Sequence, residues 1–351
     1  MGRVALVLLV VTTSVLAASG RGIARSGEVP AAEAVPTRVH CTPRDERLSE
    51  LSGLVAGPDG WYAVPDGGSR LRVYEMSPRD CSVVDSYHWN VDPYDVEDLA
   101  RSPDGRLWVA DTGDNSRRRD TIAVHVVSPE GGPARLYRMR YPDGPHDAEA
   151  LLLGRDGVPH VVTKNPFGTA GVYRPVGELD ERRPVELERV TTLRLEPTDT
   201  PGGPVPSAFG SVAVTGAATS AEHEVLAVRT YTEVYLYPVS GGVAETLARD
   251  PLRIPLPGEP QGEAVAFTPG GDLLSASERL GPVNVVPNAL GLADGRTRDS
   301  GMEGARAPHG SGSSAEDGGR AGELLPGRAA LAVGVLLVVL GVLSAASRRR
   351  R

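Results

Sequence analysis

The sequence predicts an all-β fold, a β-propeller with five recognisable blades and room for a sixth. Three observations predict it: five segments repeat one pattern, each contains a hairpin-turn motif, and the repeats recur about every 50 residues. Marking each repeat at one apolar position gives spacings of 45, 52, 66 and 48 residues between Leu54, Leu99, Leu151, Ala217 and Val265. Four short strands per period of this length are typical of a propeller blade.

Each repeat begins with a short apolar strand, turns, and continues into a second and a third strand. The turns read "GPDG", "SPDG", "GRDG" and "TPGG", in which Asp bonds to its own backbone and Gly supplies a positive φ. Fourth strands are expected at "CSVVDSYHW", "ARLYRMRY", "VTTLRLE" and "ETLARDPLRI". The fifth repeat has no clear fourth strand, and the N-terminal stretch "PTRVHC" is expected to supply it and close the ring.

The two cysteines, Cys41 and Cys81, are expected to form a disulfide, because a pair in an exported protein usually does. Cys41 would lie on the closing strand and Cys81 on the outer strand of the first blade. The bond would then hold the ring closed, and chain entropy predicts a stabilisation of about 3–4 kcal/mol for such a loop.

The two ends of the chain predict an exported, anchored protein. Residues 1–19 have the pattern of a signal peptide, and the apolar run 329–346 is long enough to cross a bilayer. The arginines of the basic tail 347–351 favour a cytoplasmic C-terminus, so the propeller, residues 36–287, would lie outside the cell membrane. Residues 288–327 have few large apolar side chains and are expected to form a disordered stalk. Alternatives for the apolar run are a core helix or part of a cell-wall sorting signal, but "LLPGRA" departs from the sorting motif.

Composition excludes few function classes. A net charge of −8 without a basic stripe argues against nucleic-acid binding. No motif of a serine hydrolase, zinc protease, P-loop or dinucleotide site is present. Enzymatic activity therefore has no linear motif to support it, and the expected partners are the membrane and a small molecule or envelope protein.

Charged residues recur where the first strand of each repeat begins and the second ends, which is one face of a propeller. Ten positions are expected to converge on this mouth, as pairs 52/66, 97/111, 149/164, 215/229 and 263/278. Eight of them are charged, and these are the candidate ligand-binding residues: Asp66, Glu97, Asp111, Glu149, Lys164, Arg229, Glu263 and Glu278. Lys164 is the only lysine in the sequence, and we expect it to pair with Glu149.

This charged mouth leaves three interpretations open. Carboxylates from separate blades suit calcium, and the candidate metal ligands are Glu97, Asp111, Glu149 and Glu263. Clustered carboxylates can also raise one another's pKa and act as general acid and base, although no catalytic residue is identified. The third interpretation is a structural ring in which the charges neutralise one another. No cofactor is certain.

The repeats resemble secreted bacterial β-propellers of the NHL, SMP-30 lactonase and esterase-like phytase type. The resemblance is carried by "VEDLARSPDGRLWVADTGDN", "HDAEALLL…VVTK" and "PQGEAVAF…LLSASE", and it covers roughly residues 40–287. In the lactonases, Glu, Asn and Asp hold a central divalent metal at the channel mouth. The resemblance therefore implies that Glu97, Glu149 and Glu263, with Asp111, hold such a metal, but Lys164 and Arg229 depart from that pattern. Fold resemblance alone does not transfer a function.

Overall fold

The computed structural model describes residues 35–295, and all of these belong to one unit of the chain. The segments 1–19, 329–346 and 347–351, and most of 288–327, lie outside the described residues. Among residues 35–295, no helix is both long enough and apolar enough to span a membrane.

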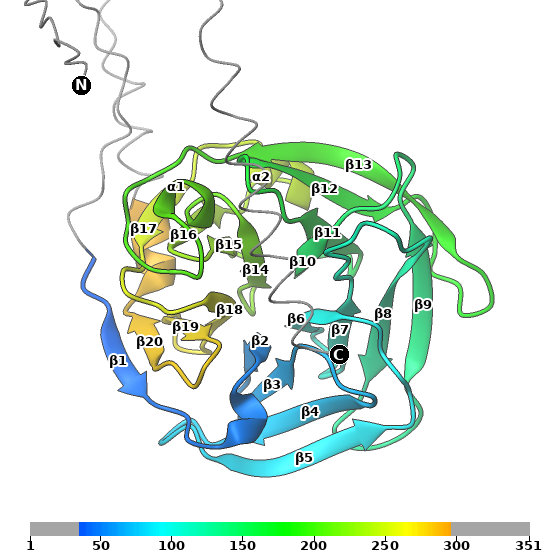
Figure 1. Cartoon of the computed structure of the whole chain (residues 1–351), viewed down its shortest axis with the longest axis horizontal. Helices are drawn as coiled ribbons and strands as arrows, with labels where there is room; N and C mark the ends of the chain where they lie inside the picture. The colour runs from blue at the N-terminus through cyan, green and yellow to red at the C-terminus, as the bar shows by residue number, and fades with distance from the viewer. Residues whose placement is uncertain (1–34, 296–351) are drawn as a thin grey trace, which may run out of the picture. The chain divides into compact units, whose positions relative to one another are not determined.

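Five blades of four antiparallel strands are arranged around a central axis (Figure 1). Blade 1 contains β2 (Leu51–Ala56), β3 (Trp61–Pro65), β4 (Leu71–Met76) and β5 (Val83–Trp89). Blade 2 contains β6 (Val96–Arg101), β7 (Leu107–Asp111), β8 (Ile122–Val127) and β9 (Arg135–Arg140). Blade 3 contains β10 (Ala148–Leu153), β11 (Pro159–Thr163), β12 (Thr169–Pro175) and β13 (Val185–Arg194).

Blade 4 contains β14 (Val214–Thr219), β15 (Val225–Thr230), β16 (Glu233–Pro238) and β17 (Leu252–Pro255). Blade 5 contains β18 (Gly262–Phe267), β19 (Leu273–Ser277), β20 (Val283–Val286) and the N-terminal β1 (Arg38–Cys41). Helices are few: η1 (Glu46–Leu48), α1 (Ser207–Gly210), α2 (Val243–Leu247) and the helical residues 289–295.

The ring is closed, because each innermost strand packs against the next. Strand β2 contacts β6, β6 contacts β10, β10 contacts β14, β14 contacts β18, and β18 returns to β2. The β-propeller is therefore confirmed, with five blades among the described residues. The long interval before blade 4 contains α1 and a loop rather than a sixth blade. Strands β9 and β13 also pair in parallel, so blades 2 and 3 form one continuous sheet.

Five apolar clusters form the core, one between each pair of neighbouring blades. A single blade could not bury both of its faces, so the stacking of blades supplies most of the apolar burial. The cluster between blades 4 and 5 also includes Ala289 and Ala293, which are fully buried. Residues 288–295, expected as the start of a disordered stalk, are thus ordered against the propeller.

The closing strand is confirmed: β1 is the outer strand of blade 5 and pairs with β20. Cys41, at the end of β1, forms a disulfide with Cys81, and their Cα atoms lie 5.8 Å apart. Cys81 lies in the turn just before β5 rather than on the strand itself. The bond therefore ties the closing strand of blade 5 to the outer part of blade 1.

Candidate functional site at the propeller mouth

A β-bulge occurs at the same place in all five innermost strands. In each strand the pairing skips one residue near its start, and the skipped residues are Ser52, Glu97, Glu149, Thr215 and Glu263. We call these five residues the axial ring. A bulge bends its strand and re-aims the side chain of the extra residue. All five side chains are buried, three of them as glutamates.

In four of the five innermost strands, the residue that follows the axial-ring residue is glycine or alanine, because neighbouring strands come too close together there for a larger side chain. These positions hold Gly53, Ala150, Gly216 and Ala264, and a Cβ on Gly216 would lie 2.2 Å from a backbone oxygen of Glu263.

The exception at this level is Asp98, whose side chain is fully buried. Its carboxylate accepts hydrogen bonds from the backbone N–H groups of Leu99 (2.8 Å), Leu151 (2.8 Å) and Ala217 (3.1 Å). Asp98 therefore ties the innermost strands of blades 2, 3 and 4 together below the axial ring.

The observed register corrects two members of the predicted mouth. The mouth position of each second strand is the residue that follows the one paired with the start of the innermost strand. In blades 1, 3 and 5 this position is held, as expected, by Asp66, Lys164 and Glu278. In blades 2 and 4 the residues at that position are Thr112 and Tyr231. The predicted Asp111 lies one residue before Thr112, and the predicted Arg229 lies two residues before Tyr231. The prediction took the nearest charged residue at the end of each second strand, and in these two blades that residue is not the one at the mouth.

The Asp111 carboxylate is held away from the axial ring. It accepts hydrogen bonds from the backbone N–H groups of Tyr94 (3.1 Å) and Asp95 (3.0 Å), and it contacts Arg119 at 2.9 Å and His125 at 3.1 Å. Burial alone would raise the pKa of Asp111. The opposite effect of His125 and Arg119 is larger, so the pKa lies below its ordinary value. Asp111 organises the loop before β6.

Arg229 is fully buried between blades 4 and 5. Its guanidinium forms an ion pair with Glu259 at 2.8 Å and donates to Ser275 Oγ, also at 2.8 Å. Its further donors bond to backbone oxygens of both blades, including those of Thr230 and Ala264. This arginine is a fully bonded link between two blades.

Lys164 pairs with Glu149, as the sequence predicts. The ammonium Nζ lies 2.5 Å from each of the Glu149 carboxylate oxygens and 4.8 Å from the centre of the Tyr231 ring. The exposed fractions of the two paired side chains are only 12% and 5%. Although burial lowers the pKa of Lys164, the neighbouring carboxylates raise it well above its ordinary value. Lys164 is therefore charged at the mouth.

Two groups of carboxylates meet at Glu97. Asp66, Asp95 and Glu97 have oxygens within 4.8 Å of one another, and so do Glu97, Asp147 and Glu149. Of the predicted metal ligands, the structure thus brings together Glu97 and Glu149, but it groups neither Asp111 nor Glu263 with them.

The sequence reasoning missed Asp95 and Asp147, which each lie two residues before a glutamate of the axial ring. The signal was available, because "DVE" and "DAE" repeat at equivalent positions of two blades. In an extended strand, residues two apart lie on the same face.

The crowding of these buried carboxylates raises their pKa values. Burial, followed by the Glu149 charge, raises the pKa of Glu97 well above normal. Burial also raises the pKa of Glu149, and the Lys164 charge acts against this. Burial and the Asp147 charge raise the pKa of Asp95 to about 6. For the same two kinds of reason the pKa of Glu263 rises to about 8 and that of Glu278 to about 7. At neutral pH this cluster favours binding either protons or a cation.

Space and donor chemistry at Glu97 fit a cation. A Cβ added to Gly113 would lie 2.1 Å from Glu97 Oε1 and 2.6 Å from Asp95 Oδ2, so the absence of a side chain there leaves these oxygens uncovered. Among residues 35–295, no lysine or arginine forms an ion pair with Glu97. Glu263 Oε2 is also buried without a hydrogen-bond partner in the described part of the chain. The donors are all oxygens, which is the ligand type that calcium prefers.

Aromatic side chains border the same face. Tyr94, in the loop before β6, is 59% exposed, and Phe167, in the turn between β11 and β12, is 64% exposed. Phe167 also meets the edge of the Phe209 ring on α1, at 6.4 Å between ring centres.

In the loop before β10, His146 Nε2 lies 2.9 Å from Asp143 and 3.2 Å from the Tyr173 hydroxyl. The carboxylate mouth therefore has a rim with apolar and hydrogen-bonding surfaces.

No protein-family model matches the chain, and a comparison with curated proteins found no match. Among solved structures, the chain is similar to virginiamycin B lyase from Staphylococcus aureus (TM-score 0.35, 12% identity, 68% of this chain and 66% of that chain). A gluconolactonase from Xanthomonas campestris gives a TM-score of 0.39 at 12% identity, covering 68% of this chain and 72% of that one. The PQQ-bound aldose sugar dehydrogenase from Streptomyces coelicolor gives 0.40 at 10% identity, covering 73% and 98%. The chain spans only 64–66% of the length of the lyases.

Proposed function

We propose that the propeller mouth binds a divalent cation, calcium by its donor set, and with it a small ligand. Asp66, Asp95 and Glu97 would hold the ion, while Lys164 already neutralises the neighbouring Glu149. The observation that carries the proposal is the largely buried, all-oxygen group around Glu97, beside the space that Gly113 leaves open. The exposed rings of Tyr94 and Phe167 supply an apolar contact for the organic part of a ligand.

Calorimetric titration of the purified full-length protein with calcium and magnesium tests this proposal. We expect calcium to bind at one site, Glu97→Gln to abolish binding, and Gly113→Ala to weaken it because the added methyl group would crowd the ligand oxygens. Glu188→Gln, which removes an exposed carboxylate on β13, is the matched control and should bind as the wild type does. Unchanged calcium binding in Glu97→Gln would refute the assignment.

A second candidate function is metal-assisted hydrolysis of an ester, lactone or phosphate ester. It is favoured by Glu278, whose pKa of about 7 lets it exchange a proton at neutral pH beside the cluster. The chemistry that a bound cation would supply is polarisation of the substrate oxygen. Calcium-dependent turnover of a generic ester or lactone, lost in Glu278→Gln while calcium still binds, would establish the enzyme. Calcium binding without turnover of any of these substrate types would leave ligand binding.

We also propose that the propeller is held outside the cell membrane by a single pass through residues 329–346, after removal of residues 1–19. The uncharged run followed by arginines supports this orientation. Alkaline extraction of cell membranes should leave the protein in the membrane fraction, and protease added to intact cells whose wall has been removed should reach the propeller. Release into the alkaline supernatant would contradict the anchor.

A further inference from the structure

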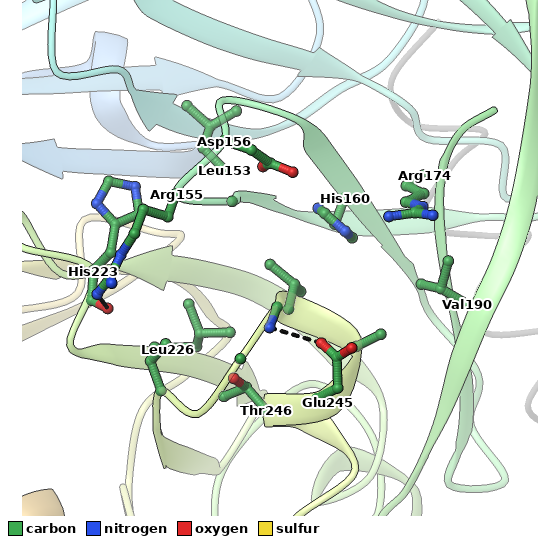
Figure 2. Close-up of a pocket in the computed structure, with 16 residues that line it drawn as sticks. Leu153, Arg155, Asp156, His160, Arg174, Val190, His223, Leu226, Glu245 and Thr246 are labelled. Atoms are coloured by element: carbon green, nitrogen blue, oxygen red, sulfur yellow. Dashed lines mark hydrogen bonds between the residues drawn. The ribbon is translucent and has the colours of Figure 1, made fainter. Parts of the chain in front are cut away.

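A cavity lies between blades 3 and 4, on the face opposite to the mouth (Figure 2). Its volume is about 340 Å³, which is at the small-molecule end of ligand pockets. The turn after β10, the turn after β14 and the start of α2 surround it. These elements lie at the far ends of the innermost strands, so none of the mouth carboxylates lines this cavity.

The floor of the cavity is apolar. Leu226 and Val243 belong to the core cluster between blades 3 and 4, and the half-buried Val190 and Val239 pack against the same cluster. In blade 4 the sequence predicts a fourth strand at "ETLARDPLRI", but the first residues of this stretch lie in α2 and the strand β17 begins only at its end. The helix packs into this cluster through Val243, and the residues around its start line the cavity.

The two ends of the cavity carry different polar groups. Figure 2 shows Arg155 and His223 together at one end, and His160 and Arg174 at the other. Arg155 donates one hydrogen bond, 3.2 Å long, to the backbone oxygen of His223. Its guanidinium has four further N–H donors, so this end can bind an anion.

His223 adopts a positive φ of 53°, where the equivalent turns of three other blades have glycine: Gly105, Gly157 and Gly271. A side chain at this conformation is disfavoured relative to glycine. The imidazole at this end of the cavity, and the carbonyl that holds Arg155, are therefore placed there at a local cost in stability.

The far end offers a hydrogen-bond acceptor. His160 is buried, and its Nδ1 lies 3.0 Å from the backbone oxygen of Val158. A carbonyl oxygen only accepts, so Nδ1 carries the proton and Nε2 is left as an acceptor. Burial lowers the pKa of His160, which keeps this ring neutral.

Neither acid of the cavity neutralises Arg155 by a direct ion pair: among residues 35–295, none of the ion pairs includes Arg155. Asp156 Oδ1 accepts instead from Val158 N at 3.1 Å, and Glu245 Oε2 accepts from Gly242 N at 2.7 Å at the start of α2.

We propose that this cavity binds a small carboxylic acid with an apolar body and a hydroxyl group at its far end. The carboxylate would pair with Arg155, the body would cover Leu226 and Val243, and the hydroxyl would donate to His160 Nε2. This site is independent of the cation at the mouth.

Calorimetry and saturation-transfer NMR on the full-length protein in EDTA test the proposal with 3-(4-hydroxyphenyl)propanoate as the probe. We expect it to bind, and 3-phenylpropanoate and 4-ethylphenol to bind about tenfold more weakly each, because each lacks one polar contact. Inorganic phosphate, which has no apolar body, should not compete.

Two variants locate the probe. Arg155→Gln should weaken binding about tenfold, and Ala244→Phe, which fills the cavity from α2, should abolish it. Arg138→Gln, an exposed arginine on β9, is the control and should change nothing. Binding that survives Ala244→Phe, equal binding of 4-ethylphenol, or no binding of any probe would overturn the proposal. Glu97→Gln should leave the probe's affinity unchanged, so failure at the mouth and failure here are distinguishable.

Discussion

Replacing Lys164 by methionine should expose the electrostatic design of the mouth. The substitution keeps an unbranched side chain beside Tyr231 but removes the ammonium that both Glu149 oxygens contact at 2.5 Å. Glu149 is almost fully buried, and an unpaired buried charge costs about 3–5 kcal/mol. The variant can avoid that cost by protonating Glu149. The free energy needed to protonate this glutamate therefore sets an upper limit on the stability that the substitution removes.

That limit depends on pH in a calculable way. The ordinary pKa of a glutamate is 4.5, and each pH unit above it costs about 1.36 kcal/mol to protonate the group. The limit is therefore about 4.8 kcal/mol at pH 8.0 and about 1.4 kcal/mol at pH 5.5. Since the native variant would bind more protons than the unfolded chain, its stability must fall as pH rises.

Urea unfolding in EDTA, followed by tryptophan fluorescence, measures this loss at both pH values. We expect Lys164→Met to be destabilised by about 3–5 kcal/mol at pH 8.0 and by about 1–2 kcal/mol at pH 5.5. Arg138→Gln controls for the loss of an exposed cation and should be near neutral. A loss that is the same at both pH values, or below about 1 kcal/mol at pH 8.0, would refute the buried pair as a source of stability.

Three further predictions follow from the fold and the mouth. Asp98→Asn should lower the free energy of unfolding by about 2–5 kcal/mol in a urea titration, because the amide nitrogen that replaces one carboxylate oxygen cannot accept the N–H hydrogen bond made there; a loss within error would contradict this. Cys41→Ser with Cys81→Ser should cost about 3–4 kcal/mol under oxidising conditions and nothing under reducing ones. Without metal, the wild type should lose stability between pH 5 and pH 9, since Glu278 and Glu263 hold protons up to pKa values of about 7 and about 8; thermal unfolding across that range checks the sign, and rising stability would contradict it.

The blades could be predicted from the sequence because their turns act locally. A motif such as "SPDG" fixes a hairpin through its own backbone bonds, and the apolar strands on either side need only a neighbouring blade to pack against. The closing strand followed from the missing fourth strand of the last repeat, and the Cys41–Cys81 bond from the expectation that two cysteines of an exported protein pair. Residues 288–295 escaped prediction because this stretch is short: only Ala289 and Ala293, with the partly buried Leu290 and Leu292, pack against the cluster between blades 4 and 5.

The mouth could be predicted only in part, because β-bulges control its register. An extra residue in each innermost strand places Glu97, Glu149 and Glu263 in the axial ring, and their convergence was expected from the repeats. The register of the second strands was not readable, since a shift of one residue sends a side chain to the other face. Asp111 was misplaced for that reason, whereas Arg229 lies two residues before the mouth position of its strand. The distant contacts of Asp98 depend on three blades meeting, which no local pattern encodes.

Anomalous diffraction from crystals of the full-length protein grown with manganese in place of calcium tests the central claim most directly. Manganese accepts the same oxygen ligands and scatters anomalously, so the ion can be located without assumption. The account predicts one peak within bonding distance of Asp66, Asp95 and Glu97, with Lys164 still on Glu149. A mouth without a peak, in crystals where the carboxylates are ordered at neutral pH, would show that protons and Lys164 alone satisfy the cluster.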